Sequence, residues 1–136
     1  MLKRRILSLF FLLALLLPTA SAANGSAARD GIRGVWVSSV YNIDYPTRQG
    51  MTADELKSEA DAILDNIASM GLNTVFFQVR PSADALYQSE LFPWSRYVSG
   101  TAGQAPDGGL DLLAYWVNRA HSRGLQLHAW INPYRI

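Results

Sequence analysis

The chain has 136 residues, of which 49% are hydrophobic and 17% charged, a balance typical of a globular protein and not of a disordered one. Its twelve Lys and Arg include three at residues 3–5, so nine basic residues face eleven acidic ones in the rest. No other basic cluster follows, which argues against nucleic-acid binding. The absence of cysteine excludes disulfides, thiolate metal sites, a cysteine nucleophile and a lipidated cysteine anchor.

The first 22 residues have the order of a secretory signal peptide. Basic residues 3–5 precede an almost entirely apolar run at 6–17, and a small-x-small sequence (ASA) follows at 20–22. A helix of that apolar run rises about 18 Å, which is less than the roughly 30 Å hydrocarbon core, so a stable membrane anchor is not expected. We expect cleavage after residue 22 and a secreted protein, periplasmic or extracellular. Residues 23–30 are expected to form a flexible leader.

Strand and helix patterns alternate from residue 31 onward. The segment 32–40 (IRGVWVSSV) is rich in β-branched and aromatic residues and predicts a strand. Thr52 and Glu55 form a capping box at the start of a predicted helix, and Gly71, which tolerates positive φ, is expected to end it. The apolar residues of this helix recur at spacings of three and four and form one stripe: Leu56, Ala60, Ile63, Leu64, Ile67 and Met70.

The second half of the chain repeats this alternation. A strand is predicted at 73–79 (NTVFFQV), because its nearly continuous hydrophobicity is typical of a parallel strand covered on both faces. The long connection that follows is rich in Gly and Pro, and a connection of this length is usually functional. Asp111 is expected to cap a helix with Trp116 in its buried stripe and Gly124 at its end. A third strand is predicted at 125–131 (LQLHAWI).

Alternating strands and helices predict an α/β fold with a parallel sheet and right-handed crossovers. We expect a (β/α)8 TIM barrel of which about the first three strands and two helices are present. A complete barrel takes about 250 residues, so 31–136 would be the truncated N-terminal part of such a domain. A small interaction module, complete as it stands, is the disfavoured alternative, because three strands leave two unpaired edges.

Functional side chains of a (β/α) barrel gather at the C-terminal ends of its strands. Side chains alternate between the two faces of a strand. On the second strand this alternation places Gln78 and Arg80 on the face opposite the aliphatic one, and on the third strand it does so for His128, Trp130 and Asn132. We expect these residues to face the barrel mouth, with Trp130 as a flat platform on which a ligand ring can stack. Alternatively, Gln78 and His128 are core hydrogen-bonding residues and Arg80 is a surface arginine.

Further candidates follow the predicted strands. The run 132–135 (NPYR) is the most distinctive, since turn chemistry alone does not require Tyr134 and Arg135 there. Asp84 follows the second strand and could equally cap a helix. The two histidines make no metal motif, and there is no Gly-rich phosphate loop and no serine nucleophile elbow. No metal and no cofactor are therefore expected.

Taken together, several pieces of sequence resemble the Glycosyl hydrolase-like 10 family: GVWV at 34–37, FQVRP at 77–81 with DALY at 84–87, PWS at 93–95 and HAWINPYR at 128–135. The resemblance covers the whole chain after the leader but only the N-terminal part of the family's domain. It implies a (β/α)8 barrel that hydrolyses glycosidic bonds. The implied substrate is a polysaccharide or the peptidoglycan glycan of the bacterial cell wall, which agrees with export.

Glycoside hydrolysis normally requires two carboxyl groups, about 5–5.5 Å or about 6.5–9.5 Å apart. No Asp or Glu ends any of the three predicted strands, and Asp44 and Asp84 fall in loops. We therefore expect the catalytic pair to lie beyond Ile136 and this fragment alone to be inactive. The alternative function is a non-catalytic glycan-binding barrel protein. In either case the expected substrate-binding residues are Arg80, Asp84, His128, Trp130, Asn132, Tyr134 and Arg135.

Overall fold

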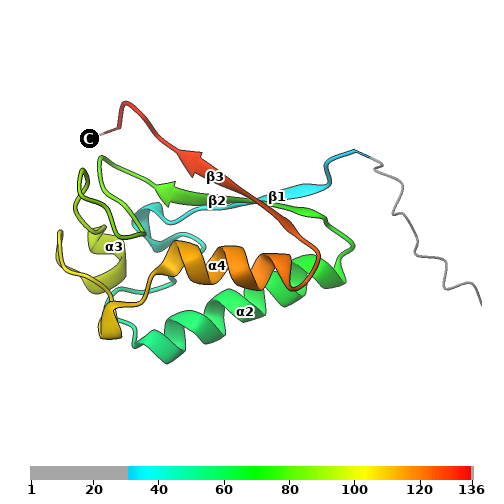
Figure 1. The fold of residues 1–136 in the computed structure, drawn as a ribbon, viewed down its shortest axis with the longest axis horizontal. Coiled ribbons are helices and arrows are strands. Elements are labelled where there is room, and N and C mark those ends of the chain that lie inside the picture. The colour runs from blue at the N-terminus through cyan, green and yellow to red at the C-terminus, as the bar shows by residue number, and fades with distance from the viewer. Residues whose placement is uncertain (1–30, 136) are drawn as a thin grey trace, which may run out of the picture. The chain divides into compact units, whose positions relative to one another are not determined.

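The computed structural model describes residues 31–135, so the predicted signal peptide and leader lie outside the described residues. Strands and helices alternate as β1 (Gly34–Val37), α2 (Ala53–Ser69), β2 (Thr74–Arg80), α4 (Leu112–His121) and β3 (Gln126–Ile131), with short helices η1 (Val40–Asn42), α3 (Arg96–Ser99) and η2 (Asp107–Gly109) in the loops. The strands form one parallel sheet in the order β1-β2-β3. Both long helices lie on the same side of this sheet (Figure 1). The predicted α/β class is confirmed.

Helix α2 begins with the predicted capping box. The Thr52 hydroxyl accepts a hydrogen bond from the Glu55 backbone N–H at 3.3 Å, and the Glu55 carboxylate accepts one from the Thr52 N–H at 2.8 Å. The helix ends at Ser69, and Gly71 follows with a φ of 72°. Met70 was expected in the buried stripe, but it is 63% exposed because it lies one residue beyond the last helical turn.

The core lies between the two helices and the sheet. One face of β2 contributes the fully buried Val75, Phe77 and Val79. The Trp116 ring of α4 stacks on the Phe77 ring, with centroids 4.3 Å apart, and meets the Tyr45 ring edge-on at 4.8 Å. The predictions that Trp116 is a core residue and that this face of β2 packs on helices are both confirmed.

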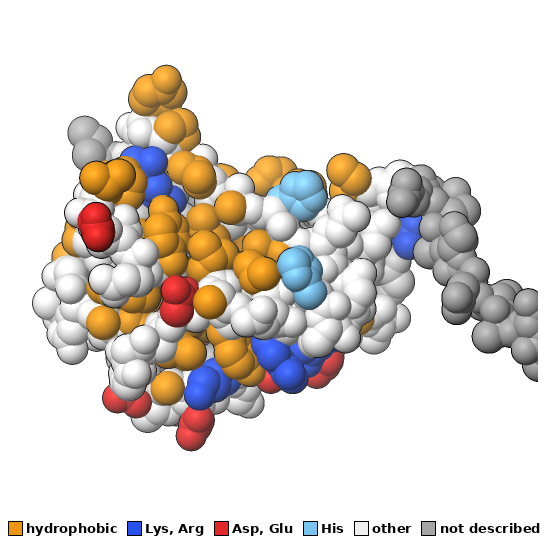
Figure 2. Space-filling model, viewed as in Figure 1, with side chains coloured by type: hydrophobic (Ala, Val, Ile, Leu, Met, Phe, Trp, Pro, Cys, Tyr) orange, Lys and Arg blue, Asp and Glu red, His pale blue; other side chains and the backbone are white. Residues whose placement is uncertain are grey.

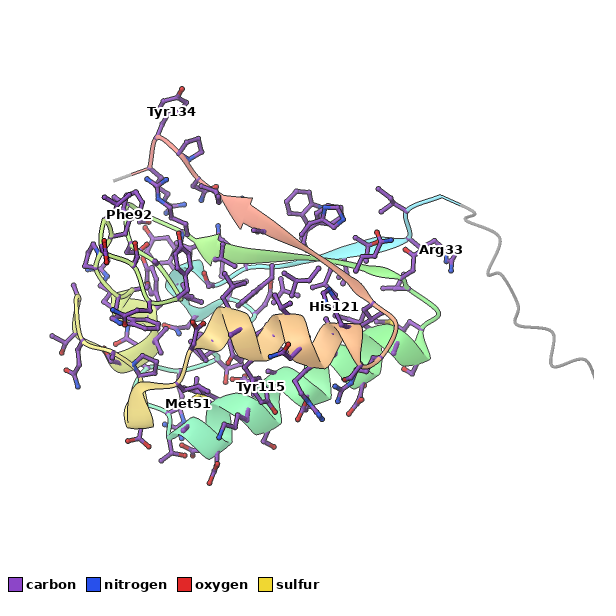
Figure 3. The ribbon with its side chains drawn as sticks, viewed as in Figure 1. Arg33, Met51, Phe92, Tyr115, His121 and Tyr134 are labelled. Atoms are coloured by element: carbon purple, nitrogen blue, oxygen red, sulfur yellow. The ribbon has the colours of Figure 1, made fainter. Side chains whose placement is uncertain are left out.

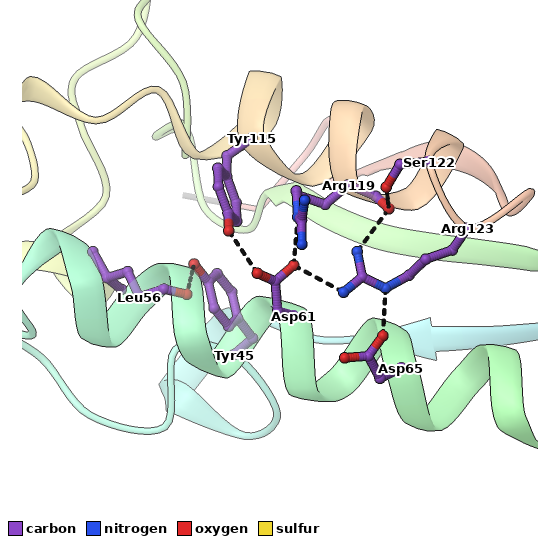
Figure 4. A network of polar contacts seen from close by, with 8 residues as sticks. All are labelled: Tyr45, Leu56, Asp61, Asp65, Tyr115, Arg119, Ser122 and Arg123. Carbon is purple, nitrogen blue, oxygen red and sulfur yellow. Dashed lines mark hydrogen bonds and ion pairs between the residues drawn. The ribbon is translucent and has the colours of Figure 1, made fainter.

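A polar network joins the outer sides of α2 and α4 (Figure 4). The Asp61 carboxylate accepts hydrogen bonds from the Tyr115 hydroxyl at 2.8 Å and from Arg119 Nε at 2.7 Å. Arg123 lies 3.1 Å from the same carboxylate and 2.6 Å from that of Asp65. The network links residues more than 50 positions apart and fixes one helix against the other.

None of the helices within residues 31–135 has the length and apolar character needed to cross a bilayer.

The opposite face of the sheet has no helix over it in the described part of the chain (Figure 1). Trp36, Phe76 and His128 occupy one register level across the three strands. The Trp36 ring, 59% exposed, stacks on Phe76 at 4.6 Å and meets Trp130 edge-on at 5.1 Å. The Phe76 and His128 rings are 5.2 Å apart. We call these four residues the aromatic row, and their common face agrees with the parity prediction.

Strand β1 ends at Val37, three residues earlier than predicted. The reason is the buried Gln78 side chain of β2, whose Oε1 accepts hydrogen bonds from the N–H groups of Ser39 and Val40, both at 2.9 Å. The Ser39 hydroxyl also donates to the Gln78 carbonyl at 2.8 Å. These bonds draw the chain out of the sheet, so the strand pattern in the sequence continues beyond the strand itself. The Gln78 Oε1 is therefore a core hydrogen-bond acceptor, whereas its buried Nε2 has no hydrogen-bond partner among the described residues.

Candidate functional site

A cavity of about 450 Å³ lies among the loops that follow the three strands. Figure 1 shows these loops at the arrowhead end of the sheet. Tyr41 comes from η1 after β1, Arg135 follows β3, and the other lining residues belong to the long connection after β2. The full lining is Tyr41, Ser82, Ala83, Asp84, Pro93, Arg96, Tyr97, Ala102 and Arg135. Each of these residues follows the C-terminal end of a parallel strand, which is where ligands bind in α/β folds. We call it the strand-end cavity.

Two tyrosines and two arginines form one wall of this cavity. The Tyr41 and Tyr97 rings meet edge-on with centroids 5.7 Å apart. The Arg135 guanidinium lies 5.3 Å from the centroid of Tyr41, and the Arg96 guanidinium lies 5.4 Å from that of Tyr97. Such contacts hold a guanidinium over a ring by cation–π attraction. The Tyr97 side chain raises the pKa of Arg96 above its usual range, so this arginine remains charged.

One carboxylate completes the lining. Asp84 is only 8% exposed, and its Oδ1 accepts a hydrogen bond from the Ser82 backbone N–H at 2.7 Å. This bond closes the tight turn that follows β2. The cavity therefore combines one fixed acceptor with two charged donors and two aromatic rings, a set that suits a hydroxyl-rich or anionic ligand.

Backbone strain is concentrated at the same place. In residues 31–135 the non-glycine residues with positive φ are Tyr41 at 57°, Asn42 at 54° and Ala83 at 45°. Tyr41 and Ala83 line the cavity, and the Asn42 amide donates to the Tyr97 carbonyl at 2.7 Å. Left-handed conformations at non-glycine residues are costly and cluster at binding and catalytic sites. The strain gives an independent reason to regard this cavity as functional.

Asp84 and Arg135 are the two predicted site residues that the structure brings together in the strand-end cavity. Arg80 lies with its guanidinium 3.9 Å from the Phe92 ring centroid, and its buried Nε has no hydrogen-bond partner in the described part of the chain. Asn132 donates to the Pro81 carbonyl at 3.1 Å and accepts from Trp130 Nε1 at 2.9 Å. Arg80 and Asn132 are therefore next to the cavity-forming loops but outside the cavity lining.

The remaining candidates lie elsewhere. His128 and Trp130 belong to the aromatic row on the uncovered face of the sheet. Tyr134 is 95% exposed and projects away from the rest of the chain (Figure 3). The sequence also predicts that Arg80, Asp84, Asn132 and Arg135 line one cleft in the whole protein, and this stays a prediction.

The sequence reasoning missed Tyr41, Arg96 and Tyr97. Nothing periodic marks them, because they lie in loops where neither the helical nor the strand repeat applies. The one signal that could have identified them is their position after the ends of the first two strands.

The described residues hold no group of three or more His, Cys, Asp or Glu arranged for a metal ion.

The parallel sheet and the polar cavity at its C-terminal edge define an α/β domain of the kind that binds polar ligands at its strand ends. The family described as Glycosyl hydrolase-like 10 matches residues 31–136, and the chain belongs to that family. It is 45% identical over 114 residues to the glycosyl hydrolase YngK of Bacillus subtilis, and the match covers 84% of this chain and 22% of the relative. It is 38% identical over 112 residues to the glycosyl hydrolase DigH of Escherichia coli K12, and this match covers 77% of this chain and 25% of the relative.

The chain therefore spans about a quarter of the length of these curated relatives. The matched part includes the sheet, both long helices and the strand-end cavity. The segments after β1, β2 and β3, which together build the cavity, thus all belong to the family's domain.

Proposed function

We propose that the full-length protein hydrolyses glycosidic bonds of a glycan outside the cytoplasm, with bacterial cell-wall glycan as the expected substrate. The observation that carries this proposal is the family match across the whole described domain. The names of the relatives, glycosyl hydrolases in two bacteria, support the same reaction class. The strand-end cavity agrees with it, because it lies where parallel α/β folds bind their ligands.

The proposal includes a (β/α)8 barrel. The sheet order β1-β2-β3 leaves one edge of β1 and one edge of β3 without a strand partner among the described residues. Additional strands at these edges would close a barrel, with α2 and α4 on its outside. The aromatic row would then face the interior, as interior positions of such barrels are filled by bulky side chains.

Within this reaction the described residues bind and orient the sugar. Asp84 offers an acceptor for sugar hydroxyls, and the arginines offer donors. The exposed Tyr41 ring (65%) offers an apolar face for a sugar ring. Only one carboxylate lines the cavity, whereas hydrolysis needs an acid and a base or nucleophile. At least one catalytic carboxylate is therefore supplied from outside the cavity as described.

This single carboxylate also favours a second candidate function, a glycan-binding protein without hydrolytic activity. The two functions differ in products and not in binding. Both predict that the protein sediments with its glycan, but only the first predicts new reducing ends.

The test is to incubate the protein expressed from its whole gene with purified cell-wall glycan. Sedimentation measures binding, and the release of reducing ends with mass analysis of the products measures hydrolysis. We expect shorter glycans with new reducing ends, and a lower yield from the variant Asp84→Asn, which keeps the side-chain size and removes the charge. Binding without release would favour the second function. If the protein neither binds the glycan nor releases reducing ends, both functions are overturned.

Export is part of the same proposal. We propose that residues 1–22 are removed during secretion, since their basic, apolar and small-residue segments follow the order of a signal peptide. N-terminal sequencing of protein recovered outside the cytoplasm should then begin at Ala23. Secreted protein that begins at Met1 would contradict the proposal.

A further inference from the structure

We infer that the strand-end cavity selects its glycan by a carboxylate carried on one of the sugars, and that Arg96 and Arg135 bind this carboxylate. The inference rests on the proposed function and adds the chemical class of the substrate. It also assigns a role to Arg96, which sequence reasoning did not identify.

The first argument is the charge balance of the lining. Two guanidinium groups and one carboxylate line the cavity. The carboxylate, Asp84, is nearly buried and already accepts the Ser82 N–H. Arg96 and Arg135 are exposed. The accessible part of the wall is therefore positively charged and attracts an anion.

The second argument is the lack of an internal partner for either arginine. Arg48, Arg119 and Arg123 each form an ion pair with a carboxylate of the chain. Within the described residues Arg96 and Arg135 form none, and each lies against a tyrosine ring instead. An aromatic contact orients the guanidinium without using its hydrogen-bond donors on a carboxylate. Each guanidinium can therefore still pair with the carboxylate of a ligand.

The third argument is the geometry of the wall. The contacts run from Arg135 to Tyr41, from Tyr41 to Tyr97 and from Tyr97 to Arg96. The two guanidiniums thus flank a pair of aromatic rings within one cavity. A sugar ring on the exposed Tyr41 would bring a carboxylate substituent into reach of the flanking arginines. A guanidinium and a carboxylate are both planar, so two N–H donors can bind the two carboxylate oxygens at once. A neutral hydroxyl cannot accept such a pair of bonds.

The experiment compares one glycan in two chemical forms. Cell-wall glycan that carries carboxylates is used as isolated and after its carboxyl groups have been reduced to alcohols, so that rings and linkages stay the same. Binding by sedimentation and release of reducing ends are measured for the protein expressed from its whole gene. We expect the native glycan to be preferred over the reduced glycan by about tenfold, which corresponds to about 1.4 kcal/mol.

Variants assign the preference to residues. Arg96→Gln and Arg135→Gln should each lower the ratio of native to reduced glycan toward one, and Arg96→Lys should keep part of it because the charge is retained. Arg48→Gln is the matched control, since it removes the same charge from an exposed arginine that pairs with Glu55 outside the cavity. It should leave the ratio unchanged. Melting temperatures of all variants verify that each is folded.

The outcomes separate this inference from the proposed function. Equal binding of native and reduced glycan by the wild type would overturn the inference, even if both are hydrolysed. A preference that survives in both glutamine variants would also overturn it. A preference in binding without any release of reducing ends would support the inference and contradict hydrolysis. If phosphatase treatment of the glycan lowers its binding and carboxyl reduction does not, the ligand group is a phosphate and the assignment to a carboxylate is wrong.

Discussion

Two regions of the molecule differ in how their charged side chains are paired. One is the helix layer formed by α2 and α4, and the other is the set of loops at the strand ends. Between the helices, Asp61 is bound by two arginines and a tyrosine (Figure 4). Figure 2 shows acidic and basic side chains side by side along the lower edge of the view, where these helices lie. At the strand ends, Arg96 and Arg135 contact tyrosine rings and form no ion pair with a carboxylate of residues 31–135. Paired charges fix the helices, whereas unpaired charges remain available to a ligand.

This comparison has a measurable consequence. Substitutions in the helix layer should change the free energy of unfolding, and substitutions at the strand ends should change glycan binding. This division can be tested in the protein expressed from its whole gene.

Trp116→Ala should be the most destabilising change. The side chain is fully buried and contacts Phe77 and Tyr45, and removal of such a ring costs about 3–5 kcal/mol. Urea denaturation measures the loss. Trp116→Phe should lose less, because most of the ring contact is retained. A loss below about 1 kcal/mol for the alanine variant would show that the helix layer is not the stable region.

Asp61→Asn should destabilise the protein by about 1–2 kcal/mol, because it weakens hydrogen bonds from charged donors. The carboxylate is partly buried and has three partners on α4 or at its end. Asp65→Asn is the matched control, since Asp65 is exposed and Arg123 is its one ion-pair partner among residues 31–135. This variant should cost less than about 0.5 kcal/mol. Equal losses in the two variants would contradict a network centred on Asp61.

The same carboxylate predicts a loss of stability in acid. Burial acts to raise the pKa of Asp61, but hydrogen bonds from Arg119 and Tyr115 outweigh it and hold the pKa below its usual range. Because the folded pKa is below the unfolded value of about 3.9, the stabilisation is present above that value and is lost as pH falls through the folded pKa. Urea denaturation between neutral pH and about pH 3 should show this decline in the wild type. The decline should be shallower in Asp61→Asn. Identical slopes in the two proteins would contradict the assignment of this decline to Asp61.

Thr52→Ala should cost about 1 kcal/mol, because it removes the side-chain half of the capping box of α2. The variant leaves the Glu55 N–H without its present acceptor. Ser58→Ala is the control, since Ser58 is exposed within the same helix and alanine has the higher helix propensity there. Thermal melting should separate the two variants, and equal melting temperatures would mean that the cap does not stabilise the helix.

The helix layer could be predicted from sequence because its signals are local and periodic. The capping box at Thr52 and the N-cap Asp111, whose side chain accepts from the Ala114 N–H, are confirmed. Alternation along β2 correctly assigned Val75 and Phe77 to the buried face. The position of a residue within a regular repeat determines which face it occupies, so no long-range information was needed.

The strand-end cavity could be predicted only in part. Asp84 and Arg135 were identified from their positions after strands, but Tyr41 and Arg96 lie in loops without a repeat. The positive φ of Tyr41 and the exit of the chain from β1 depend on the Gln78 side chain and on neighbouring loops. Such contacts join distant segments and leave no local pattern in the sequence.

Asn132→Ala should have only a small effect on stability and still reduce glycan turnover. Its amide joins the partly buried Trp130 indole to the Pro81 carbonyl. The loss of two neutral, part-buried hydrogen bonds should cost about 1 kcal/mol, the low end of their summed range. Backbone pairing still joins β2 and β3 in this variant, but the Trp130 indole loses its side-chain link to the end of β2. We expect turnover to fall by roughly tenfold, since a small misplacement at a binding site is costly.

Two further variants decide what the amide of Asn132 does. Asn132→Asp retains the acceptor for Trp130 but cannot donate to Pro81, so turnover close to wild type would assign the effect to the Trp130 contact. Asn118→Ala, at an exposed position of α4, controls for the loss of an amide and should change neither quantity. Normal turnover with a large loss of stability in Asn132→Ala would place this residue with the helix layer. The division between stabilising helices and binding loops would then fail at the third strand, because a strand-end residue would act as part of the folded core.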